Sequence, residues 1–281
     1  MNKEILSQII DFAVREDIGD GDHSSKACIP EDAIGKMQLL VKEQGILAGV
    51  EVAEMVFGRI DPFVKMKRLI ADGTLVNPGD VEFVVDGKVH SLLKSERLVL
   101  NIMQRMSGIA TNTRLYANRL DGLKTRVLDT RKTTPGVRML EKEAVRIGGG
   151  VNHRMGLYDM VMLKDNHIDF AGGIAKAIEA TKAYLKENDL SLKIEVEVRN
   201  FDELEQVLTT GGIHRIMFDN FTPEATRQAV EKVANRYETE SSGNITLDTL
   251  RDYAECGVDY ISVGALTHHI NSLDLSLKAI K

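Results

Sequence analysis

The second half of the chain repeats short apolar runs that end in charged or small polar residues, with helical segments between most of them. Five of these runs are 127–132, 160–164, 194–197, 215–219 and 260–264. This alternation is typical of parallel α/β proteins, where strands form the core and residues at their carboxyl ends carry the chemistry. We expect strands to start near 126, 160, 193, 215, 237 and 260, with helices over 171–187, 201–210, 222–234 and 246–256. About six strands is fewer than the eight of a standard barrel, so the sequence predicts an incomplete α/β barrel of about six or seven parallel strands.

The first part of the chain has a different pattern. Residues 4–15 read as an amphipathic helix, and 35–93 read as short strands separated by turns, with a helix near 50–58. Residues 95–120 read as a further helix that leads into the barrel. The sequence therefore predicts an N-terminal α/β sandwich over 1–112, built from an antiparallel sheet and helices, followed by a barrel domain over 113–267.

Composition limits the class of protein. The chain has 281 residues and a formal net charge of −6, with 43% hydrophobic and 28% charged residues, as in a soluble globular protein. Its two cysteines, Cys28 and Cys256, cannot build a disulfide framework, which favours a reducing compartment. No signal-peptide pattern or membrane-length apolar run is present, so we expect a cytoplasmic protein without a membrane partner. The negative charge argues against a nucleic-acid partner.

Positive charge is concentrated in one stretch of this acidic chain. Between Lys124 and His167 there are nine Lys or Arg residues against five Asp or Glu residues. Several of the cations lie in glycine-rich or strand-end segments rather than at the i, i+4 spacing of a solvated helix face. This excess favours a binding site for a small polyanion.

Three cationic motifs fall in that stretch. The segment 129–136 joins Arg131 and Lys132 to two threonines and a Pro-Gly turn, and is equally compatible with an exposed basic turn. Three glycines at 148–150 let the backbone approach a ligand and precede His153 and Arg154. Lys164 ends an apolar strand, where a lysine is expected to have an anionic partner.

Carboxylates end the next two strands. Glu197 and Asp219 could hold sugar hydroxyls, bind Mg²⁺ through water or stabilise a developing cation, and a salt bridge to Lys164 is the structural alternative. Glu195 lies two residues from Glu197 on the same strand face, so the pattern alone does not choose between them. The segments 241–244 and 263–265 end the last two strands, where barrels commonly bind phosphate.

In chain order, these motifs resemble the quinolinate phosphoribosyltransferases, or carboxylating nicotinate-nucleotide pyrophosphorylases, over essentially the whole chain. The matching segments are 101–111, 129–136, 148–156, 163–168, 195–198, 218–220, 240–244 and 263–268. Departures are mild: Met106 and Val137 stand where leucine is common, and Asn244 where a second glycine is frequent. The resemblance implies transfer of phosphoribosyl from phosphoribosyl pyrophosphate to quinolinate, giving nicotinate mononucleotide, pyrophosphate and CO₂ in NAD biosynthesis. It also implies Mg²⁺ as cofactor, a C-terminal helix over 268–281 that joins the first domain, and a homodimer with shared active sites, either alone or within a hexamer.

The resemblance further assigns residues to each substrate. Those for quinolinate are Arg97 of the neighbouring subunit, Arg131, His153, Arg154 and Lys164. Those for the phosphoribosyl donor are Lys132, Glu197, Asp219, Ser242, Gly243, Asn244, Gly264, Ala265 and His268. Catalysis would fall to Lys132, Lys164, Glu197 and Asp219. Mg²⁺ would bind mainly to the donor pyrophosphate, with contacts through water to Glu197 and Asp219.

Three other functions are compatible with parts of this pattern. One is a related phosphoribosyltransferase that acts on nicotinate or another anion, but retention of four cations favours a dicarboxylate. A Schiff-base aldolase using Lys164 is a second, and the Arg and His residues around the same strand ends argue against it. A non-enzymatic carrier or binding module is the third, and it would leave Glu197 and Asp219 without a role.

Overall fold

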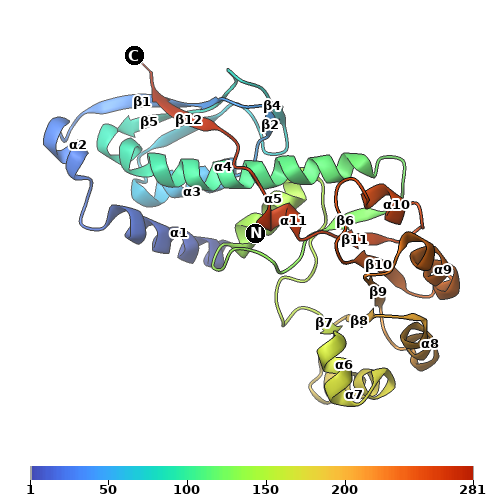
Figure 1. The fold of residues 1–281 in the computed structure, drawn as a ribbon. Coiled ribbons are helices and arrows are strands. Elements are labelled where there is room, and N and C mark those ends of the chain that lie inside the picture. The colour runs from blue at the N-terminus through green and yellow to red at the C-terminus, as the bar shows by residue number, and fades with distance from the viewer. Residues whose placement is uncertain (1, 281) are drawn as a thin grey trace. The chain divides into compact units, whose positions relative to one another are not determined.

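The chain divides into two compact units. The computed structural model describes residues 2–280. Residues 1 and 281, the outer limits of the predicted domains, lie outside the described residues. The N-terminal unit contains the chain up to Arg114, Thr133–Gly149 and the segment from Leu266 onward, and the barrel unit contains Leu115–Lys132 and Gly150–Ala265. Figure 1 shows the elements of both units along the chain. None of the described helices is long and apolar enough to cross a membrane.

The barrel unit is built on a six-stranded parallel sheet with the strand order β6-β11-β10-β9-β8-β7. Its strands are β6 (Arg126–Leu128), β7 (Val161–Leu163), β8 (Ile194–Val198), β9 (Arg215–Asp219), β10 (Glu238–Ser242) and β11 (Tyr260–Ser262). Its helices are α6 (Asp165–Ala171), α7 (Ile174–Glu187), α8 (Phe201–Thr210), α9 (Pro223–Val233) and α10 (Leu250–Ala254). The predicted strand starts and helix positions are confirmed to within a few residues.

The barrel is incomplete, as predicted. Among the described residues no ladder joins β6 to β7, the two edge strands. Beyond β6 there is a single parallel bridge between Leu128 and Val151, which ties the segment after the glycine triplet to the sheet. Because the sheet does not close with eight strands, the irregular segment around Val151 can lie beside the edge strand β6.

Side-chain alternation within the strands decides what fills the barrel. In β8, Ile194, Val196 and Val198 face one side, and Glu195 and Glu197 face the other. Helix α8 packs against this strand, on the side where the apolar residues are expected. The charged residues therefore point into the barrel, which standard barrels fill with bulky apolar side chains.

The N-terminal unit contains a four-stranded antiparallel sheet with the order β12-β1-β5-β3 and a two-stranded ladder of β2 and β4. Its strands are β1 (Ile34–Val41), β2 (Gly45–Ile46), β3 (Lys65–Arg68), β4 (Leu75–Val76), β5 (Val81–Lys88) and β12 (Leu275–Ala279). Its helices are α1 (Lys3–Ile18), α2 (His23–Cys28), α3 (Val50–Ile60), α4 (Val89–Arg119), α5 (Arg138–Gly148) and α11 (Ala265–His268), with the ends of α4 and α11 shared with the barrel unit. The predicted sandwich of an antiparallel sheet and helices is confirmed.

The predicted helix over 268–281 is wrong. Helix α11 ends at His268, and the following segment forms β12, which pairs antiparallel with β1. The physical reason is a period of two: Leu273, Leu275 and Leu277 are buried, with polar residues between them. The segment joins the N-terminal unit as a strand.

The unit boundaries also differ from the predicted ones. The first break falls after Arg114, and Thr133–Gly149, which includes α5, belongs to the N-terminal unit rather than to the barrel. Helix α5 is held to α4 by an ion pair in which Nη2 of Arg105 lies 2.6 Å from Oε1 of the buried Glu141. Because the N-terminal unit includes α5 from later in the chain, a single boundary in the sequence cannot separate the two units.

Candidate active site

The carboxyl ends of four adjacent strands gather charged and polar side chains in the barrel unit. Parallel strands end at the same edge of a sheet, so residues distant in sequence meet there. The residues at these ends are Lys164 after β7, Glu197 in β8, Asp219 in β9 and Ser242 in β10. The structure thus brings together four of the residues that the sequence predicted for the donor or the acceptor.

Lys164 forms an ion pair with Glu197. Its Nζ lies 3.5 Å from Oε2 of Glu197, and the lysine side chain is half exposed while the glutamate is nearly buried. Its backbone N–H donates to Nδ1 of His167 at 3.0 Å, which closes the turn from β7 into α6. This turn holds the Lys164 side chain at the sheet edge. The ion pair with Glu197 confirms the anionic partner that the sequence predicted for Lys164.

Opposing influences act on Glu197. Burial raises the pKa of its carboxyl group, the charge of Lys164 lowers it, and the charge of Asp219 raises it. Asp219 is half buried and accepts a hydrogen bond at 2.9 Å from the side-chain amide of Asn220. Two carboxylates that repel one another beside a lysine are suited to bind a cation or the hydroxyl groups of a sugar.

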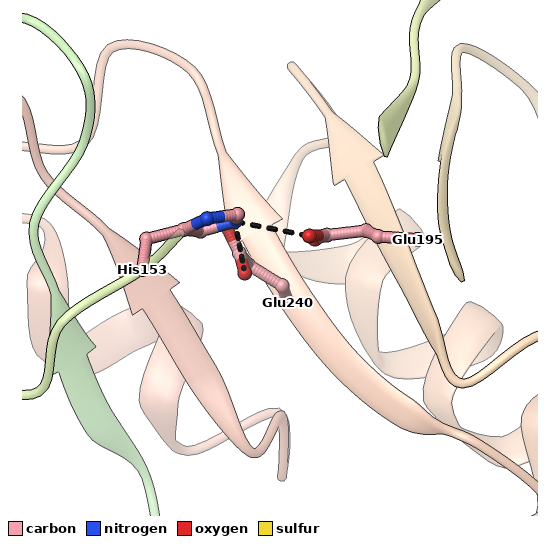
Figure 2. Close-up of side chains that lie close together, drawn as sticks. All are labelled: His153, Glu195 and Glu240. Atoms are coloured by element: carbon pink, nitrogen blue, oxygen red, sulfur yellow. Dashed lines mark ion pairs between the residues drawn. The ribbon is translucent and has the colours of Figure 1, made fainter. Parts of the chain in front are cut away.

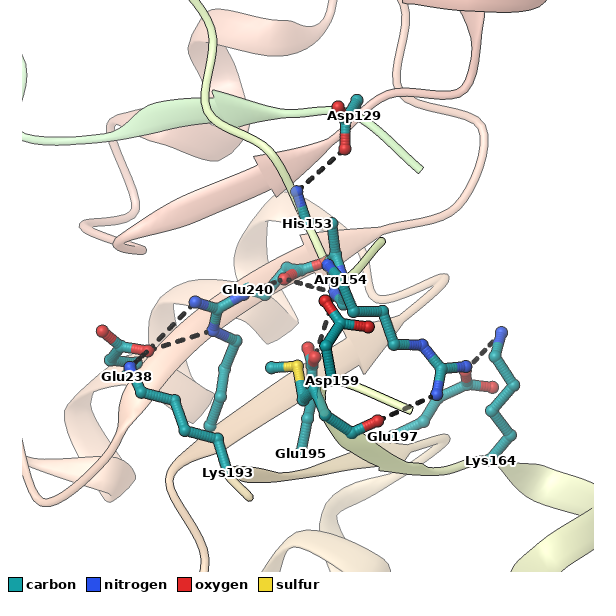
Figure 3. Close-up of polar contacts among 12 residues, drawn as sticks. Asp129, His153, Arg154, Asp159, Lys164, Lys193, Glu195, Glu197, Glu238 and Glu240 are labelled. Carbon is teal, nitrogen blue, oxygen red and sulfur yellow. Dashed lines mark hydrogen bonds and ion pairs between the residues drawn. The ribbon is translucent and has the colours of Figure 1, made fainter. Parts of the chain in front are cut away.

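Arg154 extends toward this pair from the segment that follows the glycine triplet. Its Nη1 donates to the backbone oxygen of Met160 at 3.2 Å, and Figure 3 shows its side chain running toward Lys164 and Glu197. Burial lowers the pKa of its guanidinium, and the charge of Arg131 lowers it further. Arg131 and Lys132 are exposed in the loop after β6. An excess of cations at one sheet edge is suited to an anion with more than one negative group.

His153 lies below that edge and is buried. Its ring is 6% exposed, with Nε2 3.0 Å from Oε2 of Glu195 and 3.5 Å from Oε2 of Glu240 (Figure 2). Its Nδ1 accepts a hydrogen bond from the backbone N–H of Arg154 at 2.7 Å. The histidine that was predicted to line the acceptor pocket therefore turns both ring nitrogens to groups of its own chain.

The sequence prediction missed two members of this buried group, Glu240 and Arg215. Burial and the neighbouring charge of Glu195 raise the pKa of Glu240 to about 8. Burial also raises the pKa of Glu195, although Arg215 opposes that shift. The signal available in the sequence was a charged residue within each strand: Arg215 begins β9, and Glu240 lies between two small polar residues in β10.

The loop after β10 has an unusual backbone. Gly243 and Asn244 have φ values of 100° and 51°, and Asn220 on the neighbouring loop has 55°. The two loops are joined because the N–H of Asn220 donates to the oxygen of Ser242 at 2.9 Å, and Nδ2 of Asn244 donates to Oδ1 of Asn220 at 3.3 Å. Successive left-handed residues of this kind can turn backbone N–H groups toward an anion.

The remaining predicted residues lie beyond these four strand ends. Gly264 and Ala265 follow β11, at the start of α11. Arg97 is exposed on α4 and His268 is exposed at the end of α11, and both belong to the N-terminal unit. The ring centroid of His268 lies 4.4 Å from that of His269.

Known proteins resemble the chain over its whole length. Residues 22–107 match the family model "Quinolinate phosphoribosyl transferase, N-terminal domain", and residues 109–278 match that of the C-terminal domain. Quinolinate phosphoribosyltransferase [decarboxylating] 1b of Nicotiana tabacum is 46% identical over 97% of this chain and 82% of its own length. The probable nicotinate-nucleotide pyrophosphorylase [carboxylating] of Bacillus subtilis is 41% identical over 99% of this chain and 94% of its own length. The crystal structure of NadC from Streptococcus pyogenes has a TM-score of 0.93 and 38% identity, covering 100% of this chain and 99% of that one. With both family models matched, the chain belongs to the quinolinate phosphoribosyltransferase family.

Proposed function

We propose that this protein transfers the phosphoribosyl group of phosphoribosyl pyrophosphate to quinolinate and releases pyrophosphate and CO₂, forming nicotinate mononucleotide. The names of its relatives support this reaction. The observation that carries the proposal is the arrangement at one sheet edge, where Arg154 and Lys164 lie beside the carboxylates Glu197 and Asp219. Cations suit a dicarboxylate and carboxylates suit a ribose that becomes positively charged.

The acceptor side of the proposed site consists of cations. Quinolinate has carboxylates on adjacent ring carbons, and Arg131, Arg154 and Lys164 would bind them through charge-assisted hydrogen bonds. Arg97 of a second subunit would complete the pocket. His153 would contribute from behind Arg154, since its ring is buried and its Nδ1 accepts the N–H of Arg154.

The donor side consists of carboxylates, a lysine and loops. Lys132 would bind the pyrophosphate, and the loops of the last strands would bind the 5′-phosphate through backbone N–H groups. The proposed residues are Ser242, Gly243, Asn244 and Gly264 at the strand ends, with Ala265 and His268 of α11. Glu197 and Asp219 would hold the ribose hydroxyls.

The proposed reaction has two stages. The pyridine nitrogen bonds to C1′ of the ribose as the bond from C1′ to pyrophosphate breaks, and pyrophosphate leaves with the electron pair. Glu197 and Asp219 would stabilise the positive charge that develops on the ribose ring. The bond between C2 and its carboxylate then breaks, CO₂ leaves, and the electron pair stays on C2 beside the quaternary nitrogen until it forms a C–H bond with a proton from water. No protein base is required for this second stage.

Mg²⁺ is the proposed cofactor. Glu197 and Asp219 supply the carboxylate oxygens that Mg²⁺ prefers, and the charge of Asp219 raises the pKa of Glu197, a repulsion that a cation would relieve. When bound, Mg²⁺ would be held mainly by the donor pyrophosphate, with water between it and these residues, and would neutralise charge on the leaving group.

The oligomeric state and cellular location follow from the same proposal. A homodimer, alone or within a hexamer, would supply Arg97 to the neighbouring site. We propose a cytoplasmic location, although one relative of Nicotiana tabacum is named mitochondrial and one of Arabidopsis thaliana chloroplastic.

The test is incubation of the purified protein with quinolinate, phosphoribosyl pyrophosphate and Mg²⁺, following CO₂ and nicotinate mononucleotide together. Equal amounts of both products are expected. A parallel reaction with nicotinate in place of quinolinate is the specificity control, because nicotinate lacks the carboxylate at C2. Absence of both products with a folded protein, or faster turnover of nicotinate, would contradict the proposed acceptor.

A further inference from the structure

A guanidinium lies inside the barrel unit and links two glutamates of the neighbouring strand. Arg215 in β9 is 7% exposed, and its Nη1 lies 3.0 Å from Oε2 of the fully buried Glu240. Its Nη2 lies 3.0 Å from Oε2 of Glu238, which is partly exposed, and its guanidinium carbon lies 4.2 Å from the ring centroid of Tyr260. The planar group is thus held from three directions, and it fixes the position of Glu240.

Glu240 in turn faces His153. The same oxygen, Oε2, that lies 3.0 Å from Arg215 lies 3.5 Å from Nε2 of the histidine. Glu195 faces that nitrogen from the other side at 3.0 Å. Figure 3 shows this row of side chains from Glu238 at one end, through Glu240, to His153 at the other.

The backbone of His153 is fixed as well. Its N–H donates to Oδ1 of the buried Asp129 at 2.8 Å. Its Nδ1 accepts from the N–H of Arg154, so the proton of a neutral ring lies on Nε2, the nitrogen that lies 3.0 Å from Glu195 and 3.5 Å from Glu240. A rotation of this ring would break the contact with the backbone of Arg154.

A metal ion bound by His153, Glu195 and Glu240 is the other use of these atoms, since one ligand atom of each lies within 4.8 Å of the others. Arg215 already lies 3.0 Å from Oε2 of Glu240, so its guanidinium would repel a cation bound at that carboxylate. Nε2 of His153 and Oε2 of Glu195 are also only 3.0 Å apart, within the range of a direct ion pair that needs no metal ion between them.

We propose that Glu195, Glu240 and Arg215 are positioning residues that hold the buried ring of His153, and through it the backbone of Arg154, so that the Arg154 guanidinium is aligned for the acceptor. This inference rests on the proposed function, because the acceptor is the dicarboxylate named there. It gives His153 a role behind the substrate rather than in contact with it.

The test compares substitutions of two glutamates that share Arg215 as a partner. Glu240→Gln replaces the carboxyl group between Arg215 and His153 with an amide of similar volume. Glu238→Gln is the matched control, because it lies on the same strand and contacts Arg215 but not His153. Glu195→Gln removes the second carboxylate. Steady-state kinetics would give separate KM values for quinolinate and for the donor, and calorimetry would give the affinity for quinolinate alone.

Glu240→Gln and Glu195→Gln are each expected to raise the KM and the Kd for quinolinate about tenfold or more, since a misplacement of about 1 Å can cost a hundredfold. The donor KM should stay within about twofold, and Glu238→Gln should stay near wild type for both substrates. Equal effects on both substrates, or equal behaviour of Glu240→Gln and the control, would overturn the inference. One equivalent of a metal that co-purifies with wild type and is lost in Glu240→Gln would overturn it too.

Two further measurements separate this inference from folding and from the proposed function. If Glu240→Gln does not fold, the paired change Arg215→Met with Glu240→Met removes both charges together, which buried ion pairs often tolerate; it should fold and show the same loss of quinolinate affinity. A crystal structure of whichever variant folds is a readout independent of turnover. His153 and Arg154 in wild-type positions would overturn the inference even if the wild type were active, whereas an inactive wild type with a displaced His153 in the variant would contradict the proposed function alone.

Discussion

In β8, Oε2 of Glu195 lies 3.0 Å from Nε2 of His153, while Glu197, two residues further along the same strand face, pairs with Lys164 at 3.5 Å. One strand face thus supplies two layers of the barrel unit. The deeper layer contains Glu195, which is buried against His153. The upper layer contains Glu197, which lies among the charged residues at the strand ends. The two glutamates, which have the same sequence pattern, therefore have different neighbours and different expected roles.

Replacing Arg154 by alanine should lower kcat/KM roughly a hundredfold, a loss of about 3 kcal/mol of transition-state stabilisation, because the proposed acceptor would lose a partly buried cationic partner. Lys124→Ala is the control, since Lys124 is exposed in the same unit and pairs with Asp259. Steady-state assays with quinolinate and the donor would compare them. Activity of Arg154→Ala close to that of the control would count against the acceptor assignment.

Mixing two inactive variants should restore activity if the active sites are shared across a dimer. Arg97→Ala and Lys132→Ala would each remove one residue from every site. After random exchange of subunits, half of the dimers are mixed and each has one intact site, so about one quarter of wild-type activity is expected. The assay needs proof by native mass spectrometry that mixed dimers form. Mixed dimers without activity would contradict a shared site.

Gly243→Ala should raise the donor KM, because a Cβ atom at this position would overlap the side-chain oxygen of Asn220 and displace the joined loops. The substitution also places alanine at a φ of 100°, which costs about 1 kcal/mol or more. Gly122→Ala is the matched control, because its φ is 83° but a Cβ atom there meets nothing within 4 Å. The control should lose stability in thermal unfolding without a change in donor KM. A change in donor KM of equal size in both variants would show that strain alone is responsible.

Removal of Mg²⁺ should abolish turnover while leaving quinolinate affinity unchanged, because the metal is proposed to act on the pyrophosphate of the donor. Dialysis against EDTA, followed by calorimetry with each substrate separately, tests both parts. Adding Mg²⁺ back should restore the activity. Full turnover in EDTA would exclude the proposed cofactor.

Glu82 in β5 should make the N-terminal unit less stable as pH rises. Its carboxyl group is fully buried, and burial together with the charges of Asp72 and Asp80 raises its pKa to about 8. The folded state then binds a proton that the unfolded state releases near pH 4.5, so the stabilising contribution is complete below that value and is lost as pH rises to 8. Glu82→Gln should therefore flatten the decline in urea-unfolding free energy between these values, and Glu31→Gln, at an exposed position, should not. Parallel curves for wild type and Glu82→Gln would contradict the raised pKa.

Much of the barrel and of its upper layer could be predicted from the sequence. Short strand segments that end in or next to Lys164, Glu197 or Asp219 carry the strand and its chemical end together. The motif resemblance added the substrates and the residues assigned to each. The C-terminal strand was misjudged because the helix over 268–281 was taken from the motif resemblance, and the partner β1 lies more than two hundred residues earlier in the chain.

The sequence by itself determined which elements form and which charged residues end them, because hydrophobic period and strand-end position are local properties. The tertiary structure alone decided the partners inside the barrel. Glu195, Arg215 and Glu240 come from three strands, and each looks locally like an ordinary charged residue of a strand. Only the parallel register of β8, β9 and β10 brings them together with His153 from a separate segment, and burial then makes their mutual contacts obligatory.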